Sequence, residues 1–151
     1  MKILVCSDSH GMKYNLKDAY ERERSEYIFF LGDGLRDLDF LELPYNVYVA
    51  AVKGNCDVAA DESETRFFEL ENKKLLLTHG HNSHVKQGLW KLDLLAREKE
   101  ADIIFYGHTH QRLETTIDNR LYLCPGALKQ GDYILLELKG GQVSYTFRTL
   151  Y

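Results

Sequence analysis

Five short apolar runs, each ending abruptly in polar residues, constrain the fold more than any other feature of this sequence. The runs are KILVCS (2–7), YIFFLG (27–32), VYVAAV (47–52), KLLLTH (74–79) and DIIFYG (102–107). Each is too short for a typical helix and has the length of a strand. Because the runs are apolar almost throughout, they suit a sheet that is covered on both faces.

Charged segments with helical periodicity separate several of these runs. The segments 15–26 and 84–100 repeat apolar residues near the helical period, so each is expected to form a helix with one buried face. A shorter helix is expected within 35–43, where Pro44 would end it.

The last third of the chain changes character. After residue 111 the pattern becomes hairpin-like, with turn residues at 118–120 and 139–141. We therefore expect one domain over residues 1–151, α/β in its first two-thirds and antiparallel after that.

Composition narrows the class of protein. The formal charge of the 151 residues is −4, which gives no electrostatic reason to expect nucleic-acid binding. No stretch approaches the roughly 18 uninterrupted apolar residues of a membrane span, so no membrane association is expected. Cys6, Cys56 and Cys124 are odd in number and widely spaced, which argues against a disulfide framework and favours a cytoplasmic location.

Every one of the five runs leads into residues that can bind a metal or an anion. The runs are followed in turn by Asp8-Ser9-His10, Asp33, Asn55-Cys56-Asp57, His79-Gly80-His81 and His108-Thr109-His110. Open α/β sheets bind ligands just outside the carboxyl ends of their strands. All six histidines of the chain lie in or near these strand ends, as surface histidines scattered by chance would not. We therefore expect the five strands to present these side chains at one edge of a sheet.

His108 and His110 carry part of this argument. They are one residue apart, and in a strand residues at this spacing point to the same side. Both imidazoles would then face one spot, and histidine is the commonest metal ligand among side chains.

The types of side chain indicate the chemistry. Carboxylates, imidazoles and one amide, without thiolates, suit Mn²⁺, Fe, Zn²⁺ or Co²⁺. Seven candidate ligands are more than one ion can use, whereas two ions about 3.5–4 Å apart with a bridging carboxylate would use them all. Two divalent ions, two aspartates and a hydroxide sum to a charge of about +1, which attracts an anionic phosphoester. The seven candidates are Asp8, His10, Asp33, Asn55, His79, His108 and His110.

The order of these segments resembles the motifs of the calcineurin-like metallophosphoesterases. The segments are DSH (8–10), GD (32–33), GNCD (54–57), THGH (78–81) and GHTH (107–110). Five motifs in order are far more specific than one GHTH alone, and the flanking strands extend the match over nearly the whole chain. The small single-domain prokaryotic phosphodiesterase branch of the superfamily is the most similar.

This resemblance implies a two-sheet β-sandwich flanked by helices, in four layers (α/β/β/α), with a dinuclear metal centre. By matching position, one ion would be held by Asp8, His10, Asp33 and His110, and the other by Asp33, Asn55, His79 and His108. Asp33 would bridge the ions, and a metal-bound water or hydroxide would attack phosphorus in line with the leaving oxygen. Mn²⁺ is the expected ion, with Zn²⁺, Fe, Co²⁺ or Ni²⁺ as alternatives.

The residue after Asn55 departs from the pattern of many family members. These carry a histidine that can protonate the leaving group, whereas this chain has Cys56, as the small branch tends to have. A thiol is a poorer general acid toward an alkoxide. Asn55 and His81 are the predicted catalytic residues; for His81, contact with the phosphate, proton donation and an orienting role beside the metal ligands all stay open.

Two further segments carry expectations. The segment 124–132 stands where relatives often have an Asn-Pro-Gly-Ser sequence, so substrate contact from this loop is not assumed. Asp37 and Asp39 are expected on the surface of the short helix.

Three functions from different classes follow. The favoured one is a metal-dependent phosphodiesterase acting on small phosphodiesters. A phosphomonoesterase, acting on proteins or on small molecules, is the alternative, although this short chain lacks the extra segments of a long peptide groove. The third is a binding scaffold like a retromer subunit of similar fold, but a scaffold has no need to keep all seven ligands. A small phosphoester is the expected substrate, and the sequence leaves a homo-oligomer open.

Overall fold

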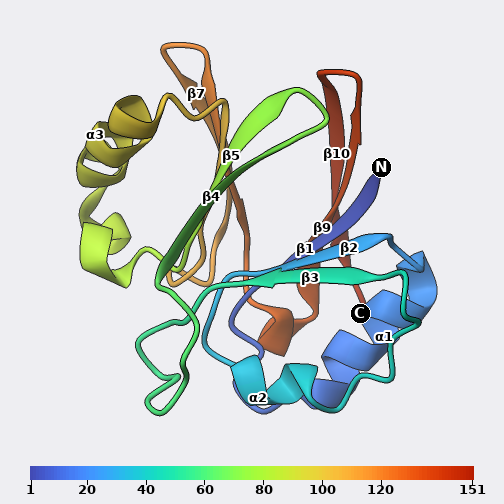
Figure 1. Cartoon of the computed structure of the whole chain (residues 1–151). Coiled ribbons are helices and arrows are strands. Elements are labelled where there is room, and N and C mark those ends of the chain that lie inside the picture. Colours follow the sequence, from blue (N-terminus) through green and yellow to red (C-terminus); the bar gives the residue numbers. More distant parts are fainter.

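Two five-stranded sheets pack face to face in the computed structural model, which describes residues 1–151 (Figure 1). The first sheet has the strand order β10-β9-β1-β2-β3, with β1 (Lys2–Cys6), β2 (Tyr27–Phe30), β3 (Tyr48–Ala51), β9 (Asp132–Lys139) and β10 (Gln142–Thr149). The second has the order β4-β5-β6-β8-β7, with β4 (Thr65–Leu70), β5 (Lys73–Thr78), β6 (Ile103–Phe105), β7 (Arg112–Ile117) and β8 (Arg120–Pro125). The strands β1, β2 and β3 are parallel, as are β5, β6 and β8, and the remaining strands pair antiparallel.

Helices cover the outer face of each sheet (Figure 1). The helical segments are α1 (Lys13–Glu23), α2 (Leu35–Leu38) and α3 (Trp90–Lys99), with the 3₁₀ turns η1 (His81–Ser83), η2 (Val85–Gln87) and η3 (Leu128–Gln130). One buried cluster joins α1 to the first sheet, and another joins α3 to the second. The four-layer α/β/β/α sandwich implied by the resemblance is therefore confirmed. None of the helices has the length and apolar character needed to cross a lipid bilayer.

The apolar runs at β1, β2, β5 and β6 are buried on both faces because each of these strands lies between two layers, whereas Tyr48 and Val49 of the edge strand β3 are exposed. In β1, Ile3 and Val5 belong to the cluster between the sheets, whereas Leu4 and Cys6 face the α1 side. This alternation is the two-residue period of a strand. Truncating such a core side chain to alanine typically costs about 2–5 kcal/mol.

The expected helices are present, but their limits differ from the prediction. Helix α1 ends at Glu23 because Arg24 adopts a left-handed backbone conformation. The segment 84–100 is α-helical only from Trp90, because residues 85–87 form the 3₁₀ turn η2 and Gly88 (φ 125°) separates this turn from α3. Helix α2 ends at Leu38, well before Pro44.

The five apolar runs do form strands, but not in one sheet. The runs at β1, β2 and β3 lie in the first sheet, and those at β5 and β6 lie in the second. The expectation of a single sheet edge was therefore wrong. Strand β4, which pairs with β5, was not expected because its burial alternates and its sequence has no apolar run.

A buried carboxylate ties α3 to the sheet beneath it. Asp93 accepts hydrogen bonds from Arg120 (Nη2 to Oδ1, 2.8 Å), from Arg97 (Nε to Oδ2, 3.0 Å) and from the Tyr122 hydroxyl. Burial alone raises the pKa of Asp93, but these hydrogen bonds outweigh it and lower the pKa overall.

Candidate metal centre

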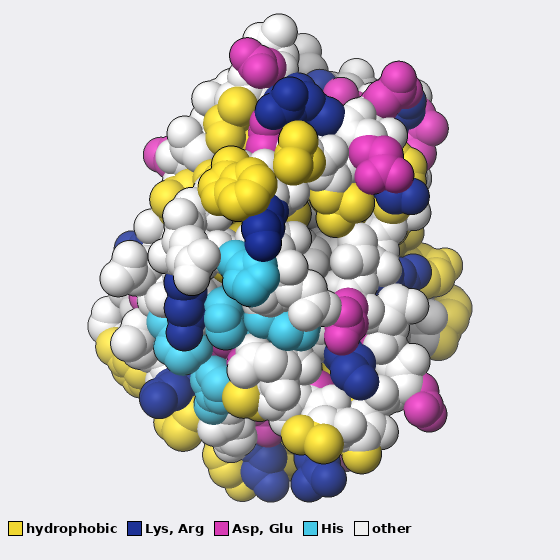
Figure 2. Space-filling model, turned by 90° about the vertical axis from the view of Figure 1, so that its left-hand side faces the viewer, with side chains coloured by type: hydrophobic (Ala, Val, Ile, Leu, Met, Phe, Trp, Pro, Cys, Tyr) yellow, Lys and Arg dark blue, Asp and Glu magenta, His cyan; other side chains and the backbone are white.

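The carboxyl ends of β1, β2 and β3 meet those of β5 and β6 on one face of the molecule. Figure 2 shows histidine side chains gathered on this face, with lysine and arginine side chains around them. The sequence-predicted residues thus come together across two sheets.

The loops that follow these strands have an unusual backbone. Five predicted ligands adopt left-handed conformations, namely Asp8 (φ 56°), His10 (φ 44°), Asp33 (φ 60°), His108 (φ 70°) and His110 (φ 62°). For residues other than glycine such a conformation costs about 1–3 kcal/mol and is concentrated at functional sites. The surrounding contacts must therefore hold each of these turns in place.

His108 and His110 do not lie in a strand, contrary to the expectation from their spacing. Strand β6 ends at Phe105, so both histidines lie in the following loop and the alternation of a strand does not apply to them. Their left-handed conformations turn the two imidazoles toward different neighbours, His108 toward His79 and His110 toward Asp8.

The two carboxylate oxygens of Asp8 have separate tasks. Oδ2 accepts hydrogen bonds from the Ser7 hydroxyl (2.5 Å) and from the backbone N–H of His108 (3.0 Å). Oδ1 faces the imidazoles, 3.1 Å from His110 Nε2 and 3.4 Å from His10 Nε2. One oxygen is thus anchored by the protein, and the other is available to an ion.

Asp33 repeats this division. Its Oδ1 accepts the backbone N–H of Cys56 at 2.7 Å, and its Oδ2 lies 3.2 Å from His79 Nε2 and 4.0 Å from His10 Nε2. Burial raises the pKa of Asp33, but hydrogen bonds from His79 and Cys56 outweigh it, so the pKa falls well below its usual range. The backbone of Gly54 lies so close to the Asp33 carboxylate that a Cβ on Gly54 would be 2.2 Å from Asp33 Oδ1.

The histidines converge in pairs. His10 Nε2 lies 3.2 Å from His110 Nε2, and His79 Nε2 lies 3.2 Å from His108 Nδ1. Because the carbonyl of Leu31 can only accept, His79 Nδ1 must donate to it (2.7 Å). The neutral imidazole therefore carries its lone pair on Nε2, whereas the protonated ring donates from Nε2 to Asp33. Burial, and then the charge of His79, lower the pKa of His108 to about 4, so this imidazole is neutral at pH 7. Nitrogens that meet at this distance either share a proton or direct their lone pairs at one ion.

The donor atoms fall into three groups whose members lie within 4.8 Å of one another. The groups are Asp8-His10-His110, Asp33-His79-His108 and His10-Asp33-Cys56. The first two consist of carboxylate and imidazole donors, the set that suits Mn²⁺, Fe, Zn²⁺ or Co²⁺. The ionised Asp33 and the neutral His108 are also in the protonation states that ligands need. The residues therefore fit the divalent ions that the sequence predicts.

Asn55 and His81 lie beside these groups of histidine, cysteine and aspartate donors. Asn55 is exposed, and its amide nitrogen lies 3.6 Å from Cys56 Sγ. His81 lies beside the cluster, its ring centroid 5.4 Å from that of His79 and its Nε2 3.9 Å from Glu64 Oε1. His81 Nδ1 is buried without a hydrogen-bond partner.

Asp37 supports the loop that carries His10, a role that the sequence argument missed. It was expected on a helix surface, but its side chain is only 6% exposed, whereas Asp39 is exposed as expected. Asp37 Oδ2 accepts hydrogen bonds from the Ser9 hydroxyl (2.5 Å) and the Gly11 N–H (3.0 Å) on both sides of His10.

Asp57 has the corresponding role for Asp33. Its Oδ2 accepts the N–H groups of Asp33 (2.7 Å) and Gly54 (2.8 Å), and its Oδ1 those of Gly34 (3.0 Å) and Leu35 (3.1 Å). One carboxylate thus holds the loops after β2 and β3 together. Its position at the end of the GNCD segment was visible in the sequence, but nothing there indicated these partners.

The segment 124–132 also supports the site through its backbone. The N–H of Leu128 donates to the Ser7 carbonyl (2.8 Å), and that of Lys129 donates to the Asp8 carbonyl (3.0 Å). This loop therefore fixes the end of β1, whatever its contact with a substrate.

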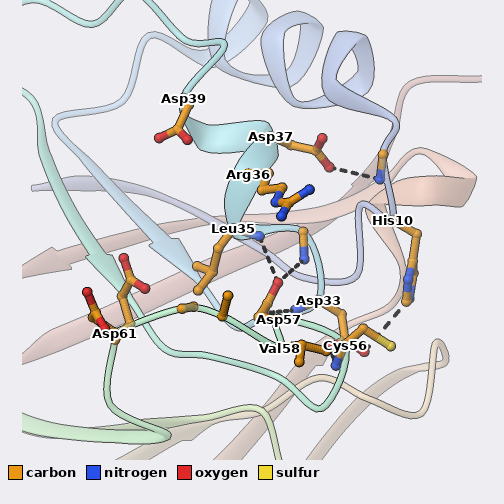
Figure 3. Close-up of a pocket in the computed structure, with 15 residues that line it drawn as sticks. His10, Asp33, Leu35, Arg36, Asp37, Asp39, Cys56, Asp57, Val58 and Asp61 are labelled. Atoms are coloured by element: carbon orange, nitrogen blue, oxygen red, sulfur yellow. Dashed lines mark hydrogen bonds and ion pairs between the residues drawn. The ribbon is translucent and has the colours of Figure 1, made fainter.

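A pocket of about 860 Å³ opens beside the cluster, between α2 and the loop 56–62 (Figure 3). His10, Asp33 and Cys56 form the end nearest the donor groups. Among its lining residues one side chain is a guanidinium, Arg36, and six are carboxylates: Asp33, Asp37, Asp39, Asp57, Asp61 and Glu62.

A β-sandwich with carboxylate and imidazole donors at its strand ends is the arrangement of a metal-dependent phosphoesterase. The sequence model of the calcineurin-like phosphoesterase superfamily domain matches residues 1–141, and the chain belongs to this superfamily. The chain is a metallophosphoesterase by the same criterion, so the resemblance noted in the sequence is confirmed.

Individual relatives agree with this assignment. The probable metallophosphoesterase YsnB of Bacillus subtilis is 33% identical over 85% of this chain and 76% of its own length. A phosphodiesterase of Methanocaldococcus jannaschii is 28% identical over 83% of each chain. A predicted phosphoesterase of Streptococcus pneumoniae, 30% identical, superposes over 98% of this chain and 88% of its own with a TM-score of 0.80. Vps29 of Entamoeba histolytica, 22% identical, covers all of both chains with a TM-score of 0.78 and shares the fold.

Proposed function

We propose that this protein is a metal-dependent phosphodiesterase that hydrolyses small phosphodiesters at a dinuclear centre. The observation that carries the proposal is the pair of donor groups Asp8-His10-His110 and Asp33-His79-His108, which reach the same face from two different sheets. Asp33 also belongs to the group with His10. Asp33 Oδ2 lies 3.2 Å from His79 Nε2 and 4.0 Å from His10 Nε2, which supports Asp33 as the bridging ligand; Asp8 Oδ1 also lies 3.9 Å from His79 Nε2.

The protein's own residues would hold two divalent ions, of which Mn²⁺ is the first candidate. Bound there, such ions activate water and stabilise the negative charge that builds on the phosphoryl oxygens. Asp8 and Asp33 present one oxygen each, held in direction by hydrogen bonds to the other oxygen. Asn55 is the proposed amide ligand beside Asp33, and His81 is the proposed contact to the phosphate.

The charge of the pocket favours a diester over a monoester. A phosphodiester carries one negative charge, whereas a monoester carries nearly two at pH 7 because its second pKa is about 6. Besides the proposed ligand Asp33, five carboxylates and one guanidinium line the pocket next to the donor groups. Repulsion from these carboxylates disfavours the more highly charged monoester. The relative from Methanocaldococcus jannaschii, which is named a phosphodiesterase, supports the same choice.

Two alternatives have their own support. A phosphomonoesterase would use the same donor groups, and the pocket charge is the argument against it. A binding scaffold is suggested by the shared fold with Vps29. The convergence of six donors and their anchoring by backbone N–H groups argue against a scaffold, because protein contacts need no such arrangement.

The test is a panel of phosphoesters with the metal-depleted protein and added Mn²⁺. We expect hydrolysis of bis(nitrophenyl) phosphate that exceeds hydrolysis of nitrophenyl phosphate, that chelation abolishes and that Mn²⁺ restores. Replacing Asp61 by Asn and Glu62 by Gln should raise the rate on the monoester more than the rate on the diester. Faster hydrolysis of the monoester by the unaltered protein would reject the diesterase, and no hydrolysis of either ester would favour the scaffold.

A further inference from the structure

The third donor group, His10-Asp33-Cys56, combines two of the proposed ligands with Cys56, which is outside the proposed ligand set. His10 also belongs to the group with Asp8 and His110, and Asp33 also belongs to the group with His79 and His108. The sulfur of Cys56 therefore joins one residue from each of the other two groups. Figure 3 shows His10, Asp33 and Cys56 turned toward one another at the end of the pocket. We propose that these three residues form an alternative site, overlapping the centre, at which a thiophilic divalent ion such as Cd²⁺ or Zn²⁺ binds and displaces Mn²⁺.

A backbone hydrogen bond keeps Cys56 beside Asp33. The N–H of Cys56 donates to Asp33 Oδ1 at 2.7 Å, so the cysteine cannot move away from the carboxylate without losing that bond. Asp33 Oδ2 stays directed at the imidazoles. Each of the three donors comes from a different loop, after β1, β2 and β3, so an ion here would link all three.

Access and donor chemistry distinguish Cys56 from the other two cysteines. Cys56 is exposed, whereas Cys6 and Cys124 are buried. Sulfur prefers soft ions, so Cys56 adds affinity for Zn²⁺ and Cd²⁺ but little for Mn²⁺. Coordination replaces the thiol proton, which passes to the solvent.

The sharing of donors makes the sites mutually exclusive. An ion bound by His10, Asp33 and Cys56 takes one ligand from each of the two proposed hard-ion positions. The amide of Asn55, 3.6 Å from the same sulfur, would also lose this contact. A thiophilic ion would therefore displace Mn²⁺ rather than bind in addition to it. This exchange of ions does not depend on a substrate and goes beyond the proposed function.

The test is spectroscopic and uses the whole chain. Metal-depleted protein is titrated with Co²⁺ under reducing conditions, because cobalt bound to a thiolate shows a ligand-to-metal charge-transfer band in the near ultraviolet. We expect the band in the unaltered protein, its loss in Cys56→Ser and its retention in the matched control Cys124→Ser. Affinity for Cd²⁺ should fall about 10-fold or more in Cys56→Ser, while affinity for Mn²⁺ changes little.

The outcomes separate this inference from the proposed function. Visible cobalt bands without the charge-transfer band would overturn the sulfur site and leave the hard-ion centre standing. The absence of any cobalt spectrum would overturn both. Cd²⁺ that binds without releasing Mn²⁺ would contradict the sharing of His10 and Asp33.

Discussion

Replacing Asp57 by Asn tests whether the metal-ligand loops are held by a residue that binds no metal. The carboxylate accepts four backbone N–H groups, two on each oxygen, from Asp33, Gly54, Gly34 and Leu35. Asparagine keeps one acceptor oxygen and puts an NH₂ donor in place of the other. Whichever way the amide turns, two of the four N–H groups lose their acceptor and face a donor instead.

The expected cost follows from these two bonds. Hydrogen bonds to a charged group contribute about 1.5–3 kcal/mol each, and water can replace part of this because Asp57 is only partly buried. We expect Asp57→Asn to lower the free energy of unfolding by about 3 kcal/mol. Because the N–H of Asp33 is among the four, affinity for Mn²⁺ should also fall by about 10- to 100-fold.

Urea unfolding in the presence of a chelator measures the first effect without any contribution from metal, and calorimetric titration of the metal-depleted protein measures the second. Asp61→Asn is the matched control, since it removes the same charge from an exposed side chain of the same pocket. Its stability should change by less than about 0.5 kcal/mol. An equal loss in both variants, or no loss in Asp57→Asn, would refute the reasoning.

Three further changes have expected outcomes. Asp33→Asn should weaken the binding of both ions and lower turnover by orders of magnitude, whereas Asn55→Ala should weaken the binding of one ion. Metal content and turnover are measured together, and an Asp33→Asn variant that leaves both unchanged would contradict the bridge. Asp93 has a lowered pKa in the folded protein, so its ion pairs stabilise the fold above the unfolded pKa of about 3.9, and this stabilisation is lost as the pH falls through the lower folded value. The difference in unfolding free energy between the unaltered protein and Asp93→Asn should therefore shrink in acid, and a difference independent of pH would count against these ion pairs. Cys56→His should speed the hydrolysis of alkyl esters by up to about 10²-fold and leave aryl esters nearly unchanged, because only an alkoxide needs a proton as it leaves. Ratios of kcat/KM for the two ester types decide this, and an equal change in both would place the proton donor elsewhere, with His81 the next candidate.

The location of the site could be predicted because strand ends are a local property of the sequence. Each apolar run stops at a residue such as Asp8, Asp33 or His79, and parallel strands bring their carboxyl ends to one side. The prediction of one sheet for all five runs was wrong, yet the predicted metal ligands do lie close together. The ends of the two packed sheets meet on the same face, so the assignment of strands to sheets did not affect the outcome.

The supports of the site could not be predicted because they depend on contacts between distant residues. Asp37 reaches Gly11 across 26 positions, and Asp57 reaches Asp33 across 24. In the sequence, Asp37 resembles a surface charge, and Asp57 is visible as the end of the GNCD segment, but nothing there indicates the partners of either. The backbone at Gly88 (φ 125°) likewise breaks the expected helix, although the apolar spacing runs on through it.

The number of divalent ions bound per chain tests the central claim most directly. Elemental analysis of the protein at saturating Mn²⁺, combined with calorimetric titration, should give two ions per chain, and the loss of either should remove hydrolysis of the diester. A plateau at one ion per chain with full hydrolytic activity would contradict the dinuclear centre built around Asp33.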